Sequence, residues 1–440
     1  MRQRRTTWIA LLCLCLIAQA RPLRAYAVIT HQAIIDAAWE NSLKPALLSR
    51  FPRATPEELR SAQAYAYGGA VIQDLGYYPV GGPYFSHLTH YVRSGSFLQA
   101  LVAESQNLNE YAFALGAISH YVADIDGHSL AVNRAVPLLY PRLRRKYGDI
   151  MTWEESPWAH SLTEFGFDTV EVVHRQVAPQ KYHEAIGFQV PRPLLERAFR
   201  QTYGLEFKDE TLSVRLRVAL YRLFAARVVP EMSEVAWALR RKELESQARS
   251  LSHQHLYHVL HPSDPAWQKL YTEPGVGDKL TAMCFRLLPK FGPLNVFDFH
   301  APTADTEQMF ADSLRATTRD YAAEVKAVQA GRLNLPEINL DTGHPTQAGE
   351  YAFCDRTYVK LLHQLKTHRF AGVSPDLRAS LLRFFEPSGG ATVRKKPRHW
   401  RRAAREIEEL KLSGTFPEPS PASTACAVDT SPLCVQMPGL

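Results

Sequence analysis

Cysteine is scarce in this chain. Only six cysteines occur in 440 residues, and Cys13 and Cys15 lie in an apolar amino-terminal segment. The other four are too few for a disulfide framework in a chain of this length, so the core must be held by burial of apolar side chains. None of the four lies near the histidine clusters in the sequence. Any metal site here therefore uses nitrogen and oxygen ligands.

A long apolar run that could span a bilayer is also absent beyond the amino terminus. Residues 1–20 begin with several arginines, continue as a short apolar stretch and end in small residues, which is typical of an export signal. Cleavage could follow Ala20, Ala25 or Ala27. We expect residues 1–25 to be a signal peptide and the mature protein to be exported, either periplasmic or secreted.

A strong charge of one sign is missing from the body of the chain. The formal net charge is +7, but this includes the arginines of the export signal and the basic segment Arg394 to Arg405. The remainder is nearly balanced, which argues against a protein that wraps duplex nucleic acid. At 46% hydrophobic and 22% charged residues, the composition is that of a globular protein.

No segment alternates polar and apolar residues convincingly as a strand. The long segments instead repeat apolar residues at intervals of three and four, which is the period of a helix. The sequence therefore predicts an all-α, multi-helical fold. Helices are expected over residues 32–39, 56–67, 96–126, 156–176, 192–203, 212–248, 303–330 and 348–366.

The second half of the chain is expected to be a helical extension packed on the first part, or a small second domain. It would cover residues 241–390 and follow a domain that ends near residue 240. Residues 391–440 are predicted to be a basic segment and a disordered tail rich in proline and serine. The part from Arg394 to Leu412 could touch anionic lipid as a peripheral membrane contact, but a solvated terminal helix is the favoured interpretation.

The stretch from Ala117 to Asn133 carries the strongest chemical signal. His120, Asp124 and His128 are spaced four residues apart, so in a helix they share one face. Their neighbours are apolar, and a buried carboxylate needs a compensating cation. Gly127 is expected to end this helix, which leaves the placement of His128 freer. The alternative is a core helix whose histidines make ordinary hydrogen bonds and whose aspartate faces solvent.

Further potential ligands stand on both sides of this stretch. Zinc in proteins binds imidazole nitrogens and carboxylate oxygens and keeps one position open for water in catalytic sites. The candidates exceed the needs of one ion, so two or three zinc ions are implied. They are His31 beside the possible helix cap Thr30, Asp74, one of the loop histidines His87 and His90, and the pair His160 and Glu164.

Each candidate also has an ordinary interpretation. His31 could be a surface residue, and Asp74 could begin a turn. His160 and Glu164 could be a simple pair on one helix face, which stabilises a helix by only a few tenths of a kcal/mol, roughly. The joint occurrence of these residues, before the middle of the chain, favours the metal site.

Several of these segments resemble a known family. The segments are THQAI, QDLGYYP, LTHY, SHYVADIDGHSL and AHSLTEFGFD. They are similar to the zinc-dependent phospholipase C family, which includes the amino-terminal domain of glycosylphosphatidylinositol-specific phospholipase D. That family shares an all-helical trinuclear zinc fold with nucleases that cleave single strands. The resemblance covers residues 26–164 and continues weakly to Leu239, so residues 26–240 are assigned as the catalytic domain.

The resemblance implies three zinc sites. One would use Asp74, His90, His120 and Asp124, with His90 preferred over His87. A second would use His128, His160 and Glu164. The third would use His31 and the far oxygen of Asp124, together with an aromatic residue at the mature amino terminus. Tyr26 has the right spacing for that role, although the best cleavage sites do not leave it first.

The resemblance also implies an activity. Zinc ions would activate water for attack on a phosphodiester, and Asp74 would be the catalytic residue that orients or deprotonates that water. We expect an exported phosphodiesterase of the phospholipase C type that acts on phospholipid or another phosphodiester. The alternatives are a single-strand nuclease of the same fold and a zinc-stabilised protein without catalysis. The sequence leaves the oligomeric state open.

Aromatic and basic residues near the candidate ligands could contact a substrate. Tyr77, Tyr78, Tyr84 and Phe85 could line a headgroup pocket or stack on a base, but core packing is an equal alternative. Arg93, Asn133 and Arg134 could reach a phosphate, although the sequence does not place them there.

Overall fold

The computed structural model describes residues 28–78, 82–173, 177–207, 214–248, 298–386 and 398–413. Within these ranges the regular secondary structure is helical apart from one antiparallel pair of two-residue strands, β1 (Ile338–Asn339) and β2 (His344–Pro345). The predicted all-α class is confirmed. In the same ranges no helix has both the length and the apolar character needed to cross a bilayer.

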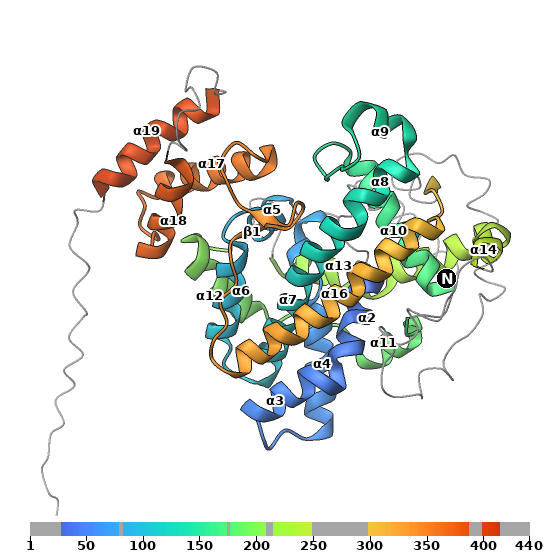
Figure 1. Cartoon of the computed structure of the whole chain (residues 1–440). Helices are drawn as coiled ribbons and strands as arrows, with labels where there is room; N and C mark the ends of the chain where they lie inside the picture. The colour runs from blue at the N-terminus through green and yellow to red at the C-terminus, as the bar shows by residue number, and fades with distance from the viewer. Residues whose placement is uncertain are drawn as a thin grey trace, which may run out of the picture.

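The elements before residue 174 are drawn in blue to green in Figure 1. Three of the short elements have unusual helical turns: η1 and η3 are π-helical and η2 is a 3₁₀ helix. The elements are α2 (Val28–Ala38), η1 (Trp39–Leu43), α3 (Lys44–Arg50), α4 (Pro56–Gly69), η2 (Ile72–Tyr77), α5 (Tyr84–Tyr91), α6 (Ser94–Glu104), α7 (Leu108–Asp126), η3 (Gly127–Val132), α8 (Asn133–Leu139), α9 (Pro141–Tyr147) and α10 (Pro157–Val173).

The later elements pack against the earlier ones. They are α11 (Gln180–Ile186), α12 (Arg192–Tyr203), α13 (Val214–Leu223), the π-helical η4 (Phe224–Val228), α14 (Val229–Ala248), α16 (Ala304–Gln329), α17 (Ala352–Thr367), α18 (Pro375–Phe385) and α19 (Arg398–Ser413).

Helix α7 is the centre of the packing. Its side chains are buried without interruption from Glu110 to Asp124. Helix α4 lies against it at a distance that only glycine allows, because a Cβ on Gly116 would meet the Ala66 carbonyl oxygen at 2.1 Å and a Cβ on Gly69 would meet that of Phe113 at 2.1 Å. The two helices are therefore held backbone to backbone, and α7 presents a rigid face to the candidate ligands.

The structure corrects several expected boundaries. The helix expected over residues 96–126 is two helices, because the Asn107 side chain accepts a hydrogen bond from the Glu110 amide and caps α7. Helix α7 ends at Asp126, next to Gly127 as expected, but the Gly127 backbone keeps helical angles (φ −62°, ψ −47°) and the chain continues directly as η3, which carries His128. The expected helix over residues 212–248 changes to π-helix in η4 and kinks at Arg240.

Two local expectations about loops and caps are also wrong. His87 and His90 lie in helix α5 rather than in a loop. Thr30 lies inside α2 and does not cap it. At the start of α10, the Ala159 amide donates to the Ser156 hydroxyl at 3.4 Å.

The part of the chain after residue 300 packs directly on the part before residue 240. Helix α16 lies along α7, where the Tyr321 hydroxyl donates to the Leu115 carbonyl oxygen at 3.0 Å (Figure 1). The ring of Phe310 in α16 stacks on Phe167 in α10 at 4.6 Å. The division into a domain that ends near residue 240 and an extension over residues 241–390 stays a prediction.

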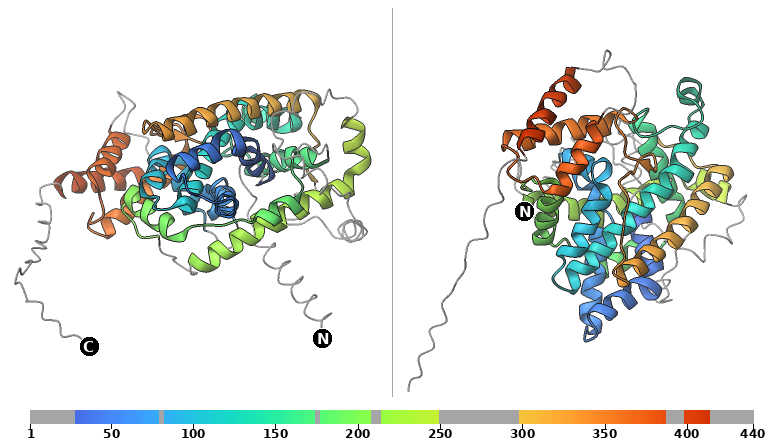
Figure 2. Two further views of the ribbon diagram at one scale, coloured as in Figure 1. Left: turned by 90° about the horizontal axis from the view of Figure 1, so that it is seen from below. Right: turned by 60° about the vertical axis from the view of Figure 1, so that its left-hand side comes forward.

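Helices α17, α18 and α19 form one end of the molecule (Figures 1 and 2). The expected solvated terminal helix is wrong for α19, because Trp400, Ala403, Ile407 and Leu410 are buried against α17 and α18. A one-sided apolar stripe of this kind stabilises a helix by burial. The export signal, Tyr26 and the tail beyond residue 413 lie outside the described residues.

Candidate metal centre

Eight predicted ligands converge from six helical elements that are far apart in the sequence. Each has at most 3% of its surface exposed. They form three groups in which the possible ligand atoms all lie within 4.8 Å of one another. The groups are His31 with His120 and Asp124, then Asp74 with His90 and His120, and finally His128 with His160 and Glu164.

Asp124 lies between two of these groups. Its Oδ1 is 3.6 Å from Nε2 of His31, and its Oδ2 is 3.3 Å from Nε2 of His90 and 3.2 Å from Nε2 of His120. The carboxylate is fully buried, and neither oxygen accepts a well-formed hydrogen bond within the described part of the chain. The two oxygens therefore face different histidines, as a carboxylate that bridges two cations would.

Three of the histidines are oriented by backbone carbonyls on their outer side. In His90, His120 and His128, the Nδ1 atom lies 2.7, 3.0 and 2.8 Å from a carbonyl oxygen. Because a carbonyl only accepts hydrogen bonds, each Nδ1 carries a hydrogen, and each Nε2 faces the carboxylates. The acceptors are, in the same order, the carbonyl groups of Ser86, Ala70 and Leu340.

His160 uses the opposite ring nitrogen. Its Nε2 lies 2.8 Å from Oδ1 of Asn133, whose own Nδ2 donates to the Asp341 carbonyl oxygen at 2.8 Å. This assigns the amide orientation of Asn133 and puts the histidine hydrogen on Nε2. Nδ1 then faces Glu164, whose Oε1 is 2.8 Å away and also lies 3.5 Å from Nε2 of His128.

The electrostatics show that this cluster requires positive charge. Burial lowers the pKa of His90, but the carboxylates of Asp124 and Asp74 outweigh it and raise the pKa to about 9. In the same way the pKa of His128 rises to about 10, because Glu164 and Asp124 outweigh its burial. Burial raises the pKa of Asp124, yet the surrounding histidines hold it well below its usual range. Without a metal ion, protons must supply the charge that a cation would supply.

Helix α10 also fixes the start of α2. Asp168 lies one turn beyond Glu164 and accepts hydrogen bonds from the amides of Ile29 and Thr30 at 3.0 and 3.2 Å and from the Thr30 hydroxyl at 2.5 Å. Burial raises the pKa of Asp168 to about 7, although these hydrogen bonds oppose the shift. Because Thr30 directly precedes His31, these hydrogen bonds to Asp168 fix the position of His31 in the candidate metal centre.

Comparison with known proteins adds a family. Residues 30–211 match the family model described as zinc dependent phospholipase C. This match supports the resemblance of that segment to the zinc-dependent phospholipase C family. The match covers less than half of the chain but includes all eight predicted ligands. No curated protein and no solved structure matches the chain.

The donor set fits the metal of the zinc-dependent phospholipase C family. Zinc accepts imidazole nitrogen and carboxylate oxygen, and both converge here without an alternative partner for Asp124. Metal-binding histidines normally donate their other N–H to a carbonyl or carboxylate. His90, His120, His128 and His160 have that arrangement toward carbonyl or amide oxygens.

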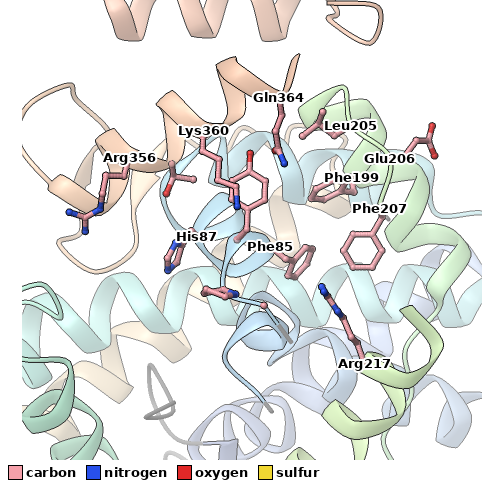
Figure 3. A pocket seen from close by; sticks show the side chains of 14 residues that line it. Phe85, His87, Phe199, Leu205, Glu206, Phe207, Arg217, Arg356, Lys360 and Gln364 are labelled. Carbon is pink, nitrogen blue, oxygen red and sulfur yellow. The ribbon is translucent and has the colours of Figure 1, made fainter. Parts of the chain in front are cut away.

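Other predicted site residues lie elsewhere. His87 packs against Tyr77 and Phe353, with ring centroids at 6.0 and 5.5 Å. It lines a cavity of about 370 Å³, and none of the eight predicted ligands does. Figure 3 shows that Phe85 and Lys360 border the same cavity.

The remaining aromatic and basic candidates serve the fold. Tyr78 packs on Tyr221 and Phe85 on Phe207, both with ring centroids at 5.1 Å, so core packing describes these two aromatics. Arg93 donates to the Asp376 carbonyl oxygen at 2.9 Å, and the exposed Arg134 donates to that of Ser129 at 2.9 Å. The structure therefore gives neither arginine a contact with the eight residues.

Two residues that support the candidate metal centre could not be predicted from the pattern of metal ligands in the sequence. Leu340 and Asp341 orient His128 and Asn133 through their carbonyl oxygens, and a backbone carbonyl has no sequence signature. They lie outside the segment that matches the family. The Asp341 carboxylate is itself fixed by the hydroxyl groups of Tyr91, at 2.8 Å, and Tyr351.

Proposed function

We propose that this chain is a zinc-dependent phosphodiester hydrolase of the phospholipase C type. The observation that carries the proposal is the placement of Asp124, a fully buried carboxylate whose two oxygens face different histidines. A stable fold would not retain an uncompensated buried charge at this position, since its desolvation is too costly. Bound cations that Asp124 bridges account for it.

The proposed ligand sets follow the three groups. Asp74, His90, His120 and Asp124 would hold one zinc ion, and His128, His160 and Glu164 a second. His31 would hold a third together with Oδ1 of Asp124. Zinc in such sites lowers the pKa of water and neutralises charge that develops on a phosphoryl group. The family match supports the choice of metal and of substrate class.

We assign the proton transfer to Asp74. Its Oδ1 lies 3.4 Å from Nε2 of His90, which leaves Oδ2 for an attacking water. Burial raises the pKa of Asp74, which makes its carboxylate a better proton acceptor than an exposed aspartate. In this proposal water attacks phosphorus directly and the proton moves to Asp74. No covalent enzyme intermediate forms: the bond between phosphorus and the alcohol oxygen breaks as water adds, and that oxygen takes up a proton returned by Asp74, so that the alcohol leaves.

We further propose that the substrate is a phospholipid and that the protein acts after export. The substrate class rests on the family match. Export rests on residues 1–25, which lie outside the described residues.

The test combines metal content with hydrolysis. The purified protein should contain two or three zinc ions by elemental mass spectrometry and should hydrolyse phosphatidylcholine in preference to single-stranded DNA. Asp124→Asn should lose zinc and reduce hydrolysis by more than about 100-fold, the upper range for losing a group that only orients a ligand. Asp126→Asn, on the same helix but outside the three groups, should keep both properties.

The assay also distinguishes the alternatives. Preference for single-stranded DNA would replace the lipid substrate by nucleic acid while keeping the zinc chemistry. A full zinc content without hydrolysis of any phosphodiester, including a soluble one such as bis(p-nitrophenyl) phosphate, would contradict the proposal. It would favour a zinc-stabilised binding protein.

A further inference from the structure

The segment of residues 141–150, called here the basic projection, stands away from the rest of the molecule. It consists of α9 and the turn that follows. Helix α9 has no buried residue, and every residue from Arg144 to Ile150 is exposed. In Figure 1, α9 extends beyond α8 at the edge of the molecule, and the right-hand view of Figure 2 shows the same segment protruding. A Cβ at Gly148 would meet nothing within 4 Å, so the turn lies in open space.

The base of the basic projection is nevertheless fixed. Just after it, the fully buried Met151 donates its amide to the Asn133 carbonyl oxygen at 2.8 Å. Just before it, Tyr140 is buried, and its ring lies 5.4 Å from that of Trp158. The projection is thus a rigidly based protrusion beside Asn133 and α10, which help to form the candidate metal centre.

The charge of the basic projection is almost entirely positive. Its sequence PRLRRKYGDI contains four cationic side chains and one acidic side chain. The acid, Asp149, forms an ion pair with Arg144 at 2.6 Å. Within the described part of the chain, Arg142 and Arg145 form no ion pair with an acid. These two exposed arginines therefore have no acidic partner among the described residues.

Exposed apolar side chains are also concentrated in this part of the sequence. Of the eight large apolar side chains that are exposed among the described residues, five lie between residues 130 and 158: Leu130, Leu138, Tyr147, Ile150 and Trp158. Ile150 is 60% exposed and Trp158 is 45% exposed. Single exposed apolar residues are ordinary, but their concentration beside unpaired cations is not.

We propose that the basic projection, together with Trp158, docks on the surface of an anionic phospholipid bilayer. Cations of the projection would contact the anionic headgroups, and Ile150, Tyr147 and Trp158 would enter the interfacial region, where aromatic and aliphatic side chains are stable. The inference deepens the proposed function, because docking there places α8 and α10, with Asn133 and His160, close to the lipid. It replaces the terminal basic helix α19 as the membrane contact, since α19 buries its apolar face against α17 and α18.

The test uses vesicle sedimentation with the full chain at 0.1 M salt. The protein should bind vesicles of phosphatidylcholine and phosphatidylglycerol in equal parts more tightly than vesicles of phosphatidylcholine alone. Each cation near an anionic surface strengthens partitioning about five-fold, so Arg142→Glu with Arg145→Glu should weaken binding by at least about 25-fold. The matched control is Arg401→Glu with Arg405→Glu, two exposed arginines of α19, which should bind as the wild type does.

A second pair of variants tests the apolar part. Ile150→Ser should weaken vesicle binding by about ten-fold or more. Leu412→Ser removes an apolar side chain that is 73% exposed on α19 and should leave binding unchanged. If the projection variants bind as the wild type does, or if the α19 variants lose binding equally, the proposal is wrong.

The outcome is separable from that of the proposed function. Vesicle binding is measured without turnover, and hydrolysis of soluble bis(p-nitrophenyl) phosphate is measured without vesicles. Binding without any hydrolysis would support docking and contradict the enzyme. Hydrolysis of the soluble diester without vesicle binding would support the enzyme and contradict docking.

Discussion

Asn133 gives the sharpest test of how the metal centre is built. Its amide joins two elements that are far apart in the sequence: Oδ1 accepts from His160 Nε2 at 2.8 Å, and Nδ2 donates to the Asp341 carbonyl oxygen at 2.8 Å. Asn133→Ala removes both hydrogen bonds at a site where Asn133 is only 2% exposed. The ring of His160 then loses the contact that fixes which nitrogen faces Glu164.

The size of the effect follows from these contacts. Two buried hydrogen bonds contribute roughly 1 to 3 kcal/mol together, and losing a group that orients a metal-binding histidine weakens metal affinity about 10- to 100-fold. We expect this loss only at the group of His128, His160 and Glu164. The other two groups contain neither Asn133 nor His160 and should keep their affinity.

The assay is zinc content after dialysis against graded chelator. Wild-type protein should lose its zinc ions over one range of chelator, whereas Asn133→Ala should release one ion at a concentration 10- to 100-fold lower, roughly. Asn133→Asp keeps an oxygen acceptor for His160 and should recover part of the affinity. Gln63→Ala is the control, because Gln63 is also a buried amide with a hydrogen bond, to Tyr67 at 3.3 Å, but lies outside the three groups.

One result would refute the reasoning about Asn133. If Asn133→Ala releases all of its zinc at the same chelator concentration as the wild type, the orientation of His160 does not depend on Asn133. If Gln63→Ala releases zinc as easily as Asn133→Ala does, the loss reflects general destabilisation.

Two further predictions concern stability. Burial, with help from Glu307 and Asp168, raises the pKa of Glu171 to about 8. The folded state therefore binds a proton that the unfolded state releases above pH 4 to 5, so stability should fall as pH rises from 5 through 8. Glu171→Gln should reduce the difference between the free energies of unfolding measured in urea at pH 5 and at pH 8. An unchanged difference would contradict the role of Glu171. Gly116→Ala should cost about 3 kcal/mol in thermal unfolding, because its Cβ would lie 2.1 Å from the Ala66 carbonyl oxygen; a stability equal to that of the wild type would show that α4 and α7 can separate.

The sequence predicted the helical class well because the signal is repeated along the chain. Apolar residues at intervals of three and four placed α4, α10, α12, α16 and α17 to within a few residues of their observed bounds. The prediction of helix boundaries failed where one polar residue interrupts a helix. Asn107 separates α6 from α7 by capping, which a count of apolar residues does not register. The expected end of α7 at Gly127 is observed, but the sequence did not predict that the chain continues directly as the π-helical η3.

The candidate ligands were predictable because their chemistry is in their side chains, whereas their orientation was not. His120, Asp124 and His128 share one face through spacing alone, and the structure gathers them with the other predicted residues. His160, Glu164 and Asp168 repeat the same four-residue spacing, so Asp168 could have been found, but its partners are amides of α2. The outer nitrogens of the histidines meet carbonyl oxygens, and every residue type has one.

Two of these carbonyl groups belong to the carboxyl-terminal part of the chain. Leu340 and Asp341 lie about 200 residues beyond His128 and Asn133, outside the segment that matches the family, yet they orient the group that contains Glu164. Their position depends on the packing of β1 and α16 against the helices before residue 240, where the Leu340 amide donates to the His90 carbonyl oxygen at 3.1 Å. Because one residue touches both His90 and His128 in this way, the carboxyl-terminal part should influence zinc affinity in two groups at once. A chain cut after residue 240 would keep all eight ligand side chains and still lose the contacts that direct His128 and, through Asn133, His160.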